Sequence, residues 1–386
     1  MRIGVNGYFW GQETTGSGQY LVHLLQALLV ISQENSYTLF VPDQAGSPSE
    51  DVAIAPGLRL VALPFNRKYE NWAKLCFEQV SFPRACQKVG AELAHVPYFA
   101  SPLFPRIPTV VTIHDLIPLL LPAYRGDFRV RLYMRLVSLA ARRADAILTD
   151  SQASRRDIVR TLGIPGERVY VAYLAAEDRF RPTADAQALA ALRAKYKLPE
   201  HYILYLGGFD QRRNIGTLLR AFAVVVRGWR DAHSLPCLVL AGQLPREDTP
   251  FSPDPRRMVS ELGLEEVVRC IGRIAEEEKP LLYNGAQFFV FPSIYEGFGL
   301  PPLEAMACGV PVIASNATSL PEIVGGGGLL VDPYDVGGWA KAITALWSQP
   351  QQRLALRSQA LVQAVRFSWA KTAEEALQVY RRVAQM

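Results

Sequence analysis

Two carboxylates, Glu296 and Glu304, lie eight positions apart in the segment 295–304, YEGFGLPPLE. The apolar residues 288–291 before this segment predict a buried strand, and Pro301 with the apolar residues after it predicts the start of a helix. In a parallel α/β sheet, such a loop lies at the carboxyl edge of the strands, where ligands bind and where the N–H groups of a helix start attract anions. We therefore expect Glu296 on the loop and Glu304 in the first helical turn.

A ligand with hydroxyl groups beside a diphosphate would use both features of this segment. One carboxylate can accept hydrogen bonds from a ribose and the other from a second sugar, while backbone N–H groups contact phosphate oxygens. A nucleotide sugar has this chemistry. In the alternative interpretation, Glu304 only complements the helix dipole and Glu296 is a solvated loop residue. The predicted donor-binding residues of the segment are Glu296, Gly297, Phe298, Gly299, Leu300 and Glu304.

Positive charge for a diphosphate is predicted to come from Arg212 and Arg213, which follow an expected strand and precede an expected helix. A guanidinium can make bidentate contacts to phosphate oxygens as the leaving group gains charge. The chain contains no Asp-x-Asp pair that would hold a divalent metal there, so we predict neither a metal nor another cofactor. In the structural alternative, the two arginines are exposed at a helix start, where they would oppose the helix dipole.

Two further features lie in the first half of the chain. Gly16, Ser17 and Gly18 follow the first expected strand and open a helix, a spacing that lets backbone N–H groups approach phosphate. Leu21 stands where a dinucleotide fingerprint has its third glycine, so a tight turn without a ligand is the alternative. His114 follows an expected strand at a carboxyl edge, although a lone histidine is more often structural than functional.

Several separated motifs resemble the family 4 glycosyltransferases, in the same order along nearly the whole chain. The resemblance implies retaining enzymes that use nucleotide sugars on the GT-B fold, in which two Rossmann-like domains have parallel sheets that face each other across a cleft. The motifs are MRIGVNGY with the Gly16 loop, TIHDLIPL around His114, TDSQASRRDI at 149–158, YLGGFDQRRNIGTLLRAF at 205–222, EGFGLPPLEAMACGVPVIAS from Glu296, and FSWAKTAEEAL from Phe367.

The resemblance also implies roles for single residues. His114 and Asp115 match a His-Asp pair that approaches the donor sugar, with a neutral imidazole orienting a sugar hydroxyl and Asp115 fixing its tautomer. The nucleotide base is read by backbone in a loop that corresponds to Arg273 and Ile274.

The implied reaction keeps the anomeric configuration. It is a front-side displacement with an oxocarbenium-like transition state, in which the departing phosphate takes the proton of the acceptor. His114, Glu296 and Arg213 are the predicted catalytic residues, as groups that bind the donor and neutralise charge. Family members commonly have an arginine where this chain has Gly208, which leaves open whether Arg212 supplies the second cation.

Strand-like runs alternate with helix-like runs along the chain, including one helix near 72–89, and this pattern predicts an α/β protein. The alternation breaks between 178 and 200, which we interpret as a linker. We expect the domains to be an acceptor-side Rossmann-like domain at 1–177, the linker at 178–200, a nucleotide-sugar-binding Rossmann-like domain at 201–366, and a helix at 367–386 that the GT-B resemblance sends back to the first domain.

Composition excludes several classes of protein. The net charge is only +5 and the basic residues are dispersed without a recognised nucleic-acid motif, so no nucleic-acid partner is predicted. No apolar run approaches the roughly 18–20 residues of a spanning helix, and the first residues read as a strand rather than a signal peptide, so we expect a cytoplasmic protein. The five cysteines show no Cys-x-x-Cys spacing, which favours reduced thiols over disulfides or zinc.

The segment 124–135, YRGDFRVRLYMR, mixes arginine with apolar residues. This composition suits an anionic membrane surface that carries a lipid-linked glycan, and would make the enzyme peripheral on the inner face of the membrane. A solvated helix face with buried apolar side chains explains the same pattern. The sequence leaves the oligomeric state open.

The motifs YLGGFDQRRN and TIHDLIPL are most similar to those of mannosyltransferases that build bacterial O-antigen polysaccharide. This similarity implies GDP-mannose as the donor, while UDP-glucose or another nucleotide sugar stays open. We expect a metal-independent hexosyltransferase that acts on a glycan or a lipid-linked glycan. A GT-B-fold UDP-sugar epimerase and a catalytically impaired nucleotide-sugar-binding protein are the alternatives.

Overall fold

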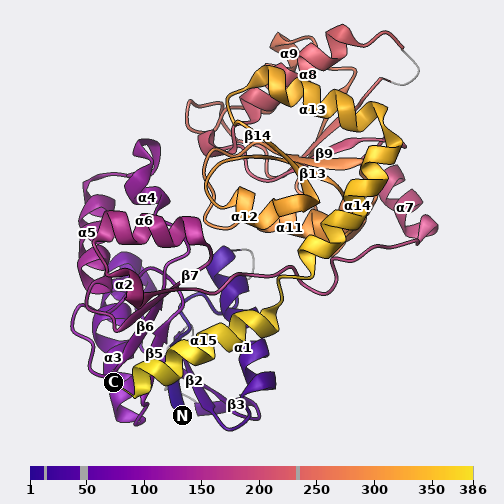
Figure 1. Cartoon of the computed structure of the whole chain (residues 1–386). Helices are drawn as coiled ribbons and strands as arrows, with labels where there is room; N and C mark the ends of the chain where they lie inside the picture. The colour runs from indigo at the N-terminus through magenta and orange to yellow at the C-terminus, as the bar shows by residue number, and fades with distance from the viewer. Residues whose placement is uncertain (13–14, 44–50, 232–234, 386) are drawn as a thin grey trace. The chain divides into compact units, whose positions relative to one another are not determined.

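The computed structural model describes residues 1–12, 15–43, 51–231 and 235–385. The chain forms two compact units (Figure 1): unit 1 comprises Met1–Leu174 and Ser368–Met386, and unit 2 comprises Ala175–Phe367. Each unit is built around its own largely parallel sheet, which confirms the predicted α/β class.

Unit 1 contains a sheet whose strands are ordered β3-β4-β2-β1-β5-β6-β7-β8. Only the edge strand β3 runs antiparallel to its neighbour, and the other pairs are parallel. The strands β5, β6 and β7 are buried at every position, because helices cover both faces of a parallel sheet. The strands are β1 (Arg2–Asn6), β2 (Ser36–Pro42), β3 (Asp51–Ala55), β4 (Leu58–Leu63), β5 (Leu93–Val96), β6 (Thr109–Thr112), β7 (Ala146–Thr149) and β8 (Val169–Val171).

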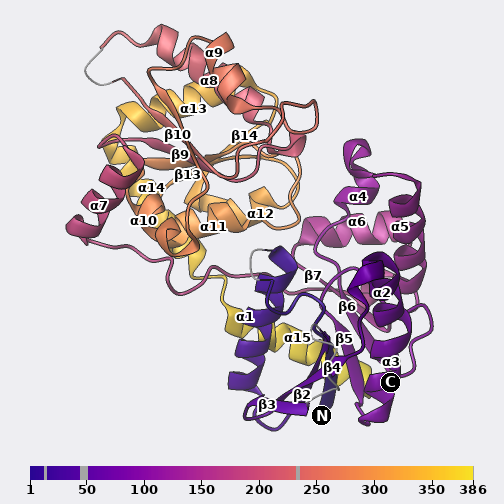
Figure 2. The same cartoon turned by 180° about the vertical axis from the view of Figure 1, so that it is seen from behind.

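The last helix of the chain, α15 (Trp369–Ala384), belongs to unit 1 and packs along α1 (Gly16–Ile31). The two helices lie side by side in both views (Figures 1 and 2). The other helices of unit 1 are α2 (Glu70–Cys76), α3 (Phe82–Lys88), α4 (Ile117–Leu120), α5 (Phe128–Ala141) and α6 (Gln152–Leu162).

The single helix expected near 72–89 is interrupted. A π-helical turn, Phe77–Ser81, separates α2 from α3. A π turn widens a helix by one residue and changes which side chains point inward, and such turns are frequent at functional sites. Here the turn carries Glu78, whose side chain is fully buried.

Unit 2 contains a fully parallel sheet with strand order β11-β10-β9-β12-β13-β14. Its strands are β9 (Ile203–Leu206), β10 (Leu238–Ala241), β11 (Val268–Gly272), β12 (Phe288–Phe291), β13 (Val312–Ser315) and β14 (Gly328–Val331). Its helices are α7 (Ala186–Tyr196), α8 (Ile215–Gly228), α9 (Pro255–Glu261), α10 (Lys279–Asn284), α11 (Leu300–Ala307), α12 (Leu320–Val324), α13 (Val336–Ser348) and α14 (Pro350–Ala364).

Each sheet has one point at which the strand order reverses direction. In unit 1 this point lies between β1 and β5, and in unit 2 it lies between β9 and β12. The loops that follow two such strands lead to opposite faces of the sheet, and doubly wound sheets bind their ligands beside these loops. The two reversal points therefore indicate where each unit is built to hold a ligand.

A chain of buried hydrogen bonds ties α15 to the sheet of unit 1. The Tyr380 hydroxyl lies 2.8 Å from Nδ1 of His95, and Nε2 of His95 lies 2.9 Å from the Thr112 hydroxyl. That hydroxyl in turn lies 3.0 Å from the hydroxyl of Tyr20, on α1. Burial lowers the pKa of His95 to about 3, so this ring stays neutral at physiological pH.

None of the helices in the described ranges has the length and apolarity that a bilayer-spanning segment needs.

Candidate functional site

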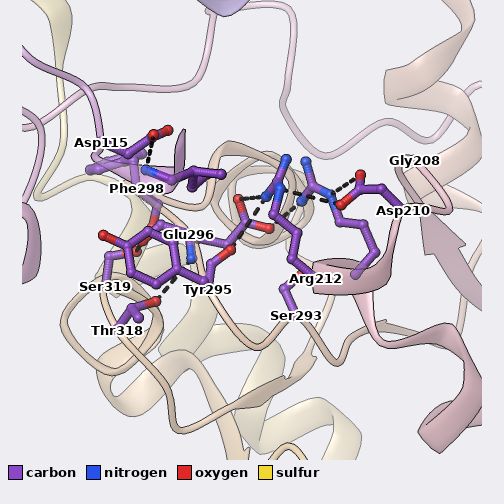
Figure 3. A network of polar contacts seen from close by, with 12 residues as sticks. Asp115, Gly208, Asp210, Arg212, Ser293, Tyr295, Glu296, Phe298, Thr318 and Ser319 are labelled. Carbon is purple, nitrogen blue, oxygen red and sulfur yellow. Dashed lines mark hydrogen bonds and ion pairs between the residues drawn. The ribbon is translucent and has the colours of Figure 1, made fainter. Parts of the chain in front are cut away.

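Glu296 and two arginines form the centre of the site in unit 2, and they come from the loops that follow β12 and β9. Figure 3 shows the Glu296 carboxylate facing Arg212, with Asp210 beyond it. Oε2 of Glu296 lies 2.9 Å from Nη1 of Arg212, and Oε1 accepts a hydrogen bond from Nη1 of Arg213. The Asp210 carboxylate approaches the Nε side of both guanidiniums. Its Oδ1 lies 3.4 Å from Nε of Arg212, and its Oδ2 lies 3.9 Å from Nε of Arg213. Each guanidinium is thus held between two carboxylates.

Two positive and two negative charges balance in this largely buried cluster. The Glu296 side chain is 9% exposed and each arginine side chain is 16% exposed. Removing one member would leave a buried charge without compensation, which is costly. Within the described residues, the buried Nε of Arg213 has no hydrogen-bond partner, and the Arg213 guanidinium lies 5.4 Å from the centre of the Phe291 ring. One N–H of the pair therefore lacks an acceptor.

Polar side chains from elsewhere in unit 2 fix the two loops. The Thr318 hydroxyl accepts from the N–H of Glu296 at 3.0 Å, and the Ser319 hydroxyl lies 3.0 Å from the Glu296 carbonyl and 2.6 Å from that of Phe298. The amide of Asn214 donates to the carbonyl of Pro292 at 3.1 Å, which joins the loop after β9 to the loop after β12. Sequence reasoning missed Thr318, Ser319 and Asn214. Each is a single polar residue that lies about 20 or 80 positions from Glu296 in the chain, so no spacing pattern indicates it.

The prediction for Glu304 needs correction. Helix α11 begins at Leu300, so Glu304 lies in its second turn rather than its first. Its Oε2 accepts a hydrogen bond of 2.8 Å from the buried hydroxyl of Tyr283, and burial raises the pKa of Glu304 against the opposing charge of Lys279. The described contacts join Glu304 to α10 and not to the Glu296 cluster.

The start of α11 has few backbone donors. Pro301 and Pro302 have no N–H, so the donors near this helix start are those of Gly297, Phe298, Gly299 and Leu300. Gly299 has a φ of +114°, which favours glycine, and a Cβ there would lie 2.8 Å from Leu320. The loop therefore needs glycine at this position for its shape.

The glycine loop of unit 1 is partly used by the fold. The N–H of Gly18 donates to the hydroxyl of Thr15, the N-cap of α1, at 3.1 Å. A Cβ on Gly18 would lie 2.2 Å from the Gln12 carbonyl oxygen, so packing requires this glycine. Gly16 meets nothing within 4 Å and is exposed, which leaves Gly16 and Ser17 as the positions that can face a ligand.

His114 lies after β6 in unit 1, as predicted, but Asp115 does not fix its tautomer. Nδ1 of His114 lies 2.8 Å from Oδ2 of Asp150, and Nε2 lies 3.3 Å from the carbonyl oxygen of Pro97. Asp115 instead accepts from the backbone N–H of Ile117 at 2.9 Å. Sequence reasoning missed Asp150, although it follows β7 at the same edge of the sheet.

The contacts of His114 favour a charged imidazole over the predicted neutral one. Burial alone lowers the pKa of His114, but the charge of Asp150 and its hydrogen bond outweigh burial and raise that pKa above the ordinary value. Both ring nitrogens face oxygens that accept, so the arrangement favours a proton on each. The ring of Tyr20 stands edge-on to the imidazole at 4.8 Å between centres and fixes its plane.

The remaining predicted residues lie outside the Glu296 cluster. Ile274 is buried and Arg273 is exposed in the loop after β11, so their part in reading a base stays a prediction. At Gly208, a Cβ would meet only the Asp210 carboxylate, at 3.2 Å. The family resemblance implies an arginine at this position, where the chain has glycine, and Arg212 lies against Glu296.

Comparison with known proteins identifies the family. Residues 14–177 match the family described as Glycosyltransferase Family 4, and residues 191–363 match Glycosyl transferases group 1. The chain is 36% identical over 274 residues to O-antigen chain mannosyltransferase B of Escherichia coli, covering 70% of each protein. The chain belongs to glycosyltransferase family 4. This family 4 enzyme is also 33% identical over 280 residues to the serotype-specific mannosyltransferase WbdA of Escherichia coli, but that match spans only 34% of WbdA.

Solved structures with low sequence identity have the same fold. Sucrose-phosphate synthase from Thermosynechococcus elongatus superposes with a TM-score of 0.76 at 24% identity, covering 99% of both chains. Anabaena HepE, solved in complex with UDP, superposes with a TM-score of 0.72 at 17% identity, again over 99% of both chains. The predicted GT-B fold and the assignment as a glycosyltransferase are confirmed, and the alternative of an epimerase is not favoured.

We expect Asp150→Asn to lower the pKa of His114, because the substitution removes the charge that stabilises the imidazolium. The titration of the ring can be followed by NMR on protein with labelled histidine. Asp115→Asn is the matched control, and its effect should be clearly smaller. An unchanged pKa in Asp150→Asn, or a larger change in Asp115→Asn, would contradict this account of the site.

Proposed function

We propose that the enzyme transfers mannose from GDP-mannose to a glycan or lipid-linked glycan acceptor, with retention of the anomeric configuration and without a metal. The observation that carries the proposal is the pair of guanidiniums gathered by Glu296 at the strand reversal of unit 2. The similarity to an O-antigen chain mannosyltransferase supports the choice of sugar.

The two arginines supply the charge that a departing diphosphate needs. Two guanidiniums this close repel each other, and the carboxylates of Glu296 and Asp210 offset that repulsion and hold them in place before the donor arrives. The phosphate oxygens are acceptors for the N–H groups that the carboxylates leave unused, such as Nε of Arg213. Preformed charge of this kind lowers the barrier without reorganisation at the moment of reaction.

The chemical step that we propose needs no nucleophile from the protein. The bond between the anomeric carbon and the phosphate oxygen breaks while the acceptor hydroxyl attacks the same face, and the acceptor's proton passes to the departing phosphate. The donor hydroxyls are held by Glu304, and backbone N–H groups of the 297–300 segment contact the phosphate oxygens. Gly16, Ser17 and His114, in unit 1, stay predicted site residues. Arg273 and Ile274 lie in the loop that would read the base.

The runner-up is a UDP-linked donor, because the structural neighbour HepE was solved with UDP.

A turnover assay tests the proposal. The protein is incubated with GDP-mannose, UDP-glucose or another nucleotide sugar, with and without a mannosylated acceptor, and with and without EDTA. We expect GDP release that requires acceptor, resists EDTA and yields a product with α-configured anomeric carbon by NMR. Exclusive turnover of a UDP-sugar would contradict GDP-mannose as the donor. Complete loss of activity with EDTA would contradict metal independence, and an inverted product would contradict retention.

A Glu296→Gln variant separates this site from a contaminating activity. The amide keeps the size of the side chain but carries no charge to hold the two guanidiniums, so we expect kcat/KM to fall by about 10²-fold. Glu261→Gln is the control, since Glu261 is 61% exposed and its carboxylate pairs with Nε of Arg257 at 3.2 Å. Wild-type turnover in Glu296→Gln would show that the carboxylate does not organise the site.

We also propose that α5 contacts an anionic membrane surface. Phe128, Leu132 and Leu139 are 67%, 56% and 52% exposed, and their spacing places them along one face of the helix. Arg129 and Arg131 are exposed beside them. An exposed apolar stripe flanked by arginines is typical of helices that lie in a membrane interface.

Co-sedimentation with vesicles that contain phosphatidylglycerol tests this contact. We expect Arg129→Glu/Arg131→Glu to weaken binding at least tenfold, since each basic residue near such a surface contributes about 1 kcal/mol. Arg227→Glu/Arg230→Glu makes the same change of charge in unit 2 and serves as the control. The proposal fails if the wild type does not bind at low salt, or if both double variants bind equally well.

A further inference from the structure

We propose that the aromatic side chains around Lys74 in unit 1 form a subsite for an uncharged sugar ring of the acceptor. This inference rests on the proposed function, because it names the chemistry by which the acceptor is recognised. It is independent of the donor site in its residues, since none of its side chains belongs to a predicted donor-site residue.

The location of the cluster points to ligand binding. Asn6 is the last residue of β1 and Tyr98 follows β5 by two residues, so both lie at the strand reversal of unit 1. Tyr8 and Phe9 follow β1 after Gly7. This is the position in unit 1 that corresponds to the Glu296 cluster in unit 2, and it is where a doubly wound sheet holds its ligand.

The ammonium group of Lys74 stands among four aromatic rings. Nζ lies 5.0 Å from the ring centre of Tyr8, 5.7 Å from Phe9, 5.9 Å from Tyr98 and 5.5 Å from Tyr133. The Lys74 side chain remains 28% exposed. Cation–π attraction accounts for the geometry of the cage, while the side chain that carries the ammonium is still partly exposed.

Two donors in the cluster have no acceptor. Among the described residues, Lys74 makes no hydrogen bond, and its only ion-pair partner, Oε1 of Glu78, lies 3.8 Å away. The amide Nδ2 of Asn6 is buried without a partner, while Oδ1 of the same side chain accepts from the Tyr98 hydroxyl at 3.2 Å and from the N–H of Tyr8 at 3.0 Å. Unused donors beside aromatic faces match a sugar, which offers hydroxyl oxygens and an apolar C–H face together.

The charge of the cluster favours an uncharged ring over a phosphate. The π-helical turn buries Glu78 below Lys74, and the Tyr133 hydroxyl lies 3.1 and 3.0 Å from its two carboxylate oxygens. Burial raises the pKa of Glu78 to about 7, with Lys74 acting in the opposite direction. Above that pH the carboxylate is ionised and balances Lys74, so the pair presents little net charge to an anion.

Acceptor kinetics at pH 8 test the subsite. Lys74→Met keeps an unbranched side chain but removes the ammonium, so we expect the KM for a mannosylated acceptor to rise about tenfold or more while kcat changes little. Phe9→Ala should raise the same KM by removing one wall of the cage. Lys68→Met is the control, because Lys68 also lies over a tyrosine ring, at 6.0 Å from that of Tyr69, but is exposed outside the cluster.

Saturation-transfer NMR with methyl α-mannobioside separates this inference from the proposed function. If no nucleotide sugar is turned over, the proposed function fails, yet wild-type protein should still bind the disaccharide and Lys74→Met should bind it much more weakly. If transfer occurs but Lys74→Met keeps the wild-type KM and disaccharide binding, the subsite is wrong. Displacement of the disaccharide by inorganic phosphate at millimolar concentration would overturn the assignment to an uncharged ring.

Discussion

The shared carboxylate of Glu296 is the interaction on which the site in unit 2 depends. Two guanidiniums from consecutive residues, Arg212 and Arg213, can lie together in a largely buried place only because Glu296 and Asp210 neutralise them. This requirement fixes the loop after β9 against the loop after β12, and Asn214 and Thr318 complete the frame. The strand reversal between β9 and β12 is what makes the two loops neighbours.

Much of this architecture could be predicted from the sequence. The buried strands were visible as short apolar runs, because a parallel sheet covered on both faces needs apolar residues at every position. Glu296, Arg212 and Arg213 were predicted as donor-site residues because they follow such runs, and residues after parallel strands gather at one edge. The order of the motifs likewise indicated the family.

The rest depended on contacts between distant residues. Asp150 lies 36 positions from His114, and only the pairing of β6 with β7 brings it to the imidazole. Glu304 lies in the second turn of α11 rather than the first, because the helix begins at Leu300. The aromatic cage could not be predicted either, because Tyr133 comes from α5 and the π-helical turn that buries Glu78 leaves no mark in apolar periodicity.

We propose that Arg212 and Arg213 together neutralise the diphosphate of the donor nucleotide, with Arg212 serving in place of the arginine absent at Gly208. Isothermal titration calorimetry tests this role of the two arginines. The diphosphate and the monophosphate of the preferred nucleoside are each titrated into wild type, Arg212→Gln and Arg213→Gln. We expect the wild type to bind the diphosphate at least tenfold more tightly than the monophosphate, and each substitution to remove most of this preference. An unchanged preference in either variant would contradict it.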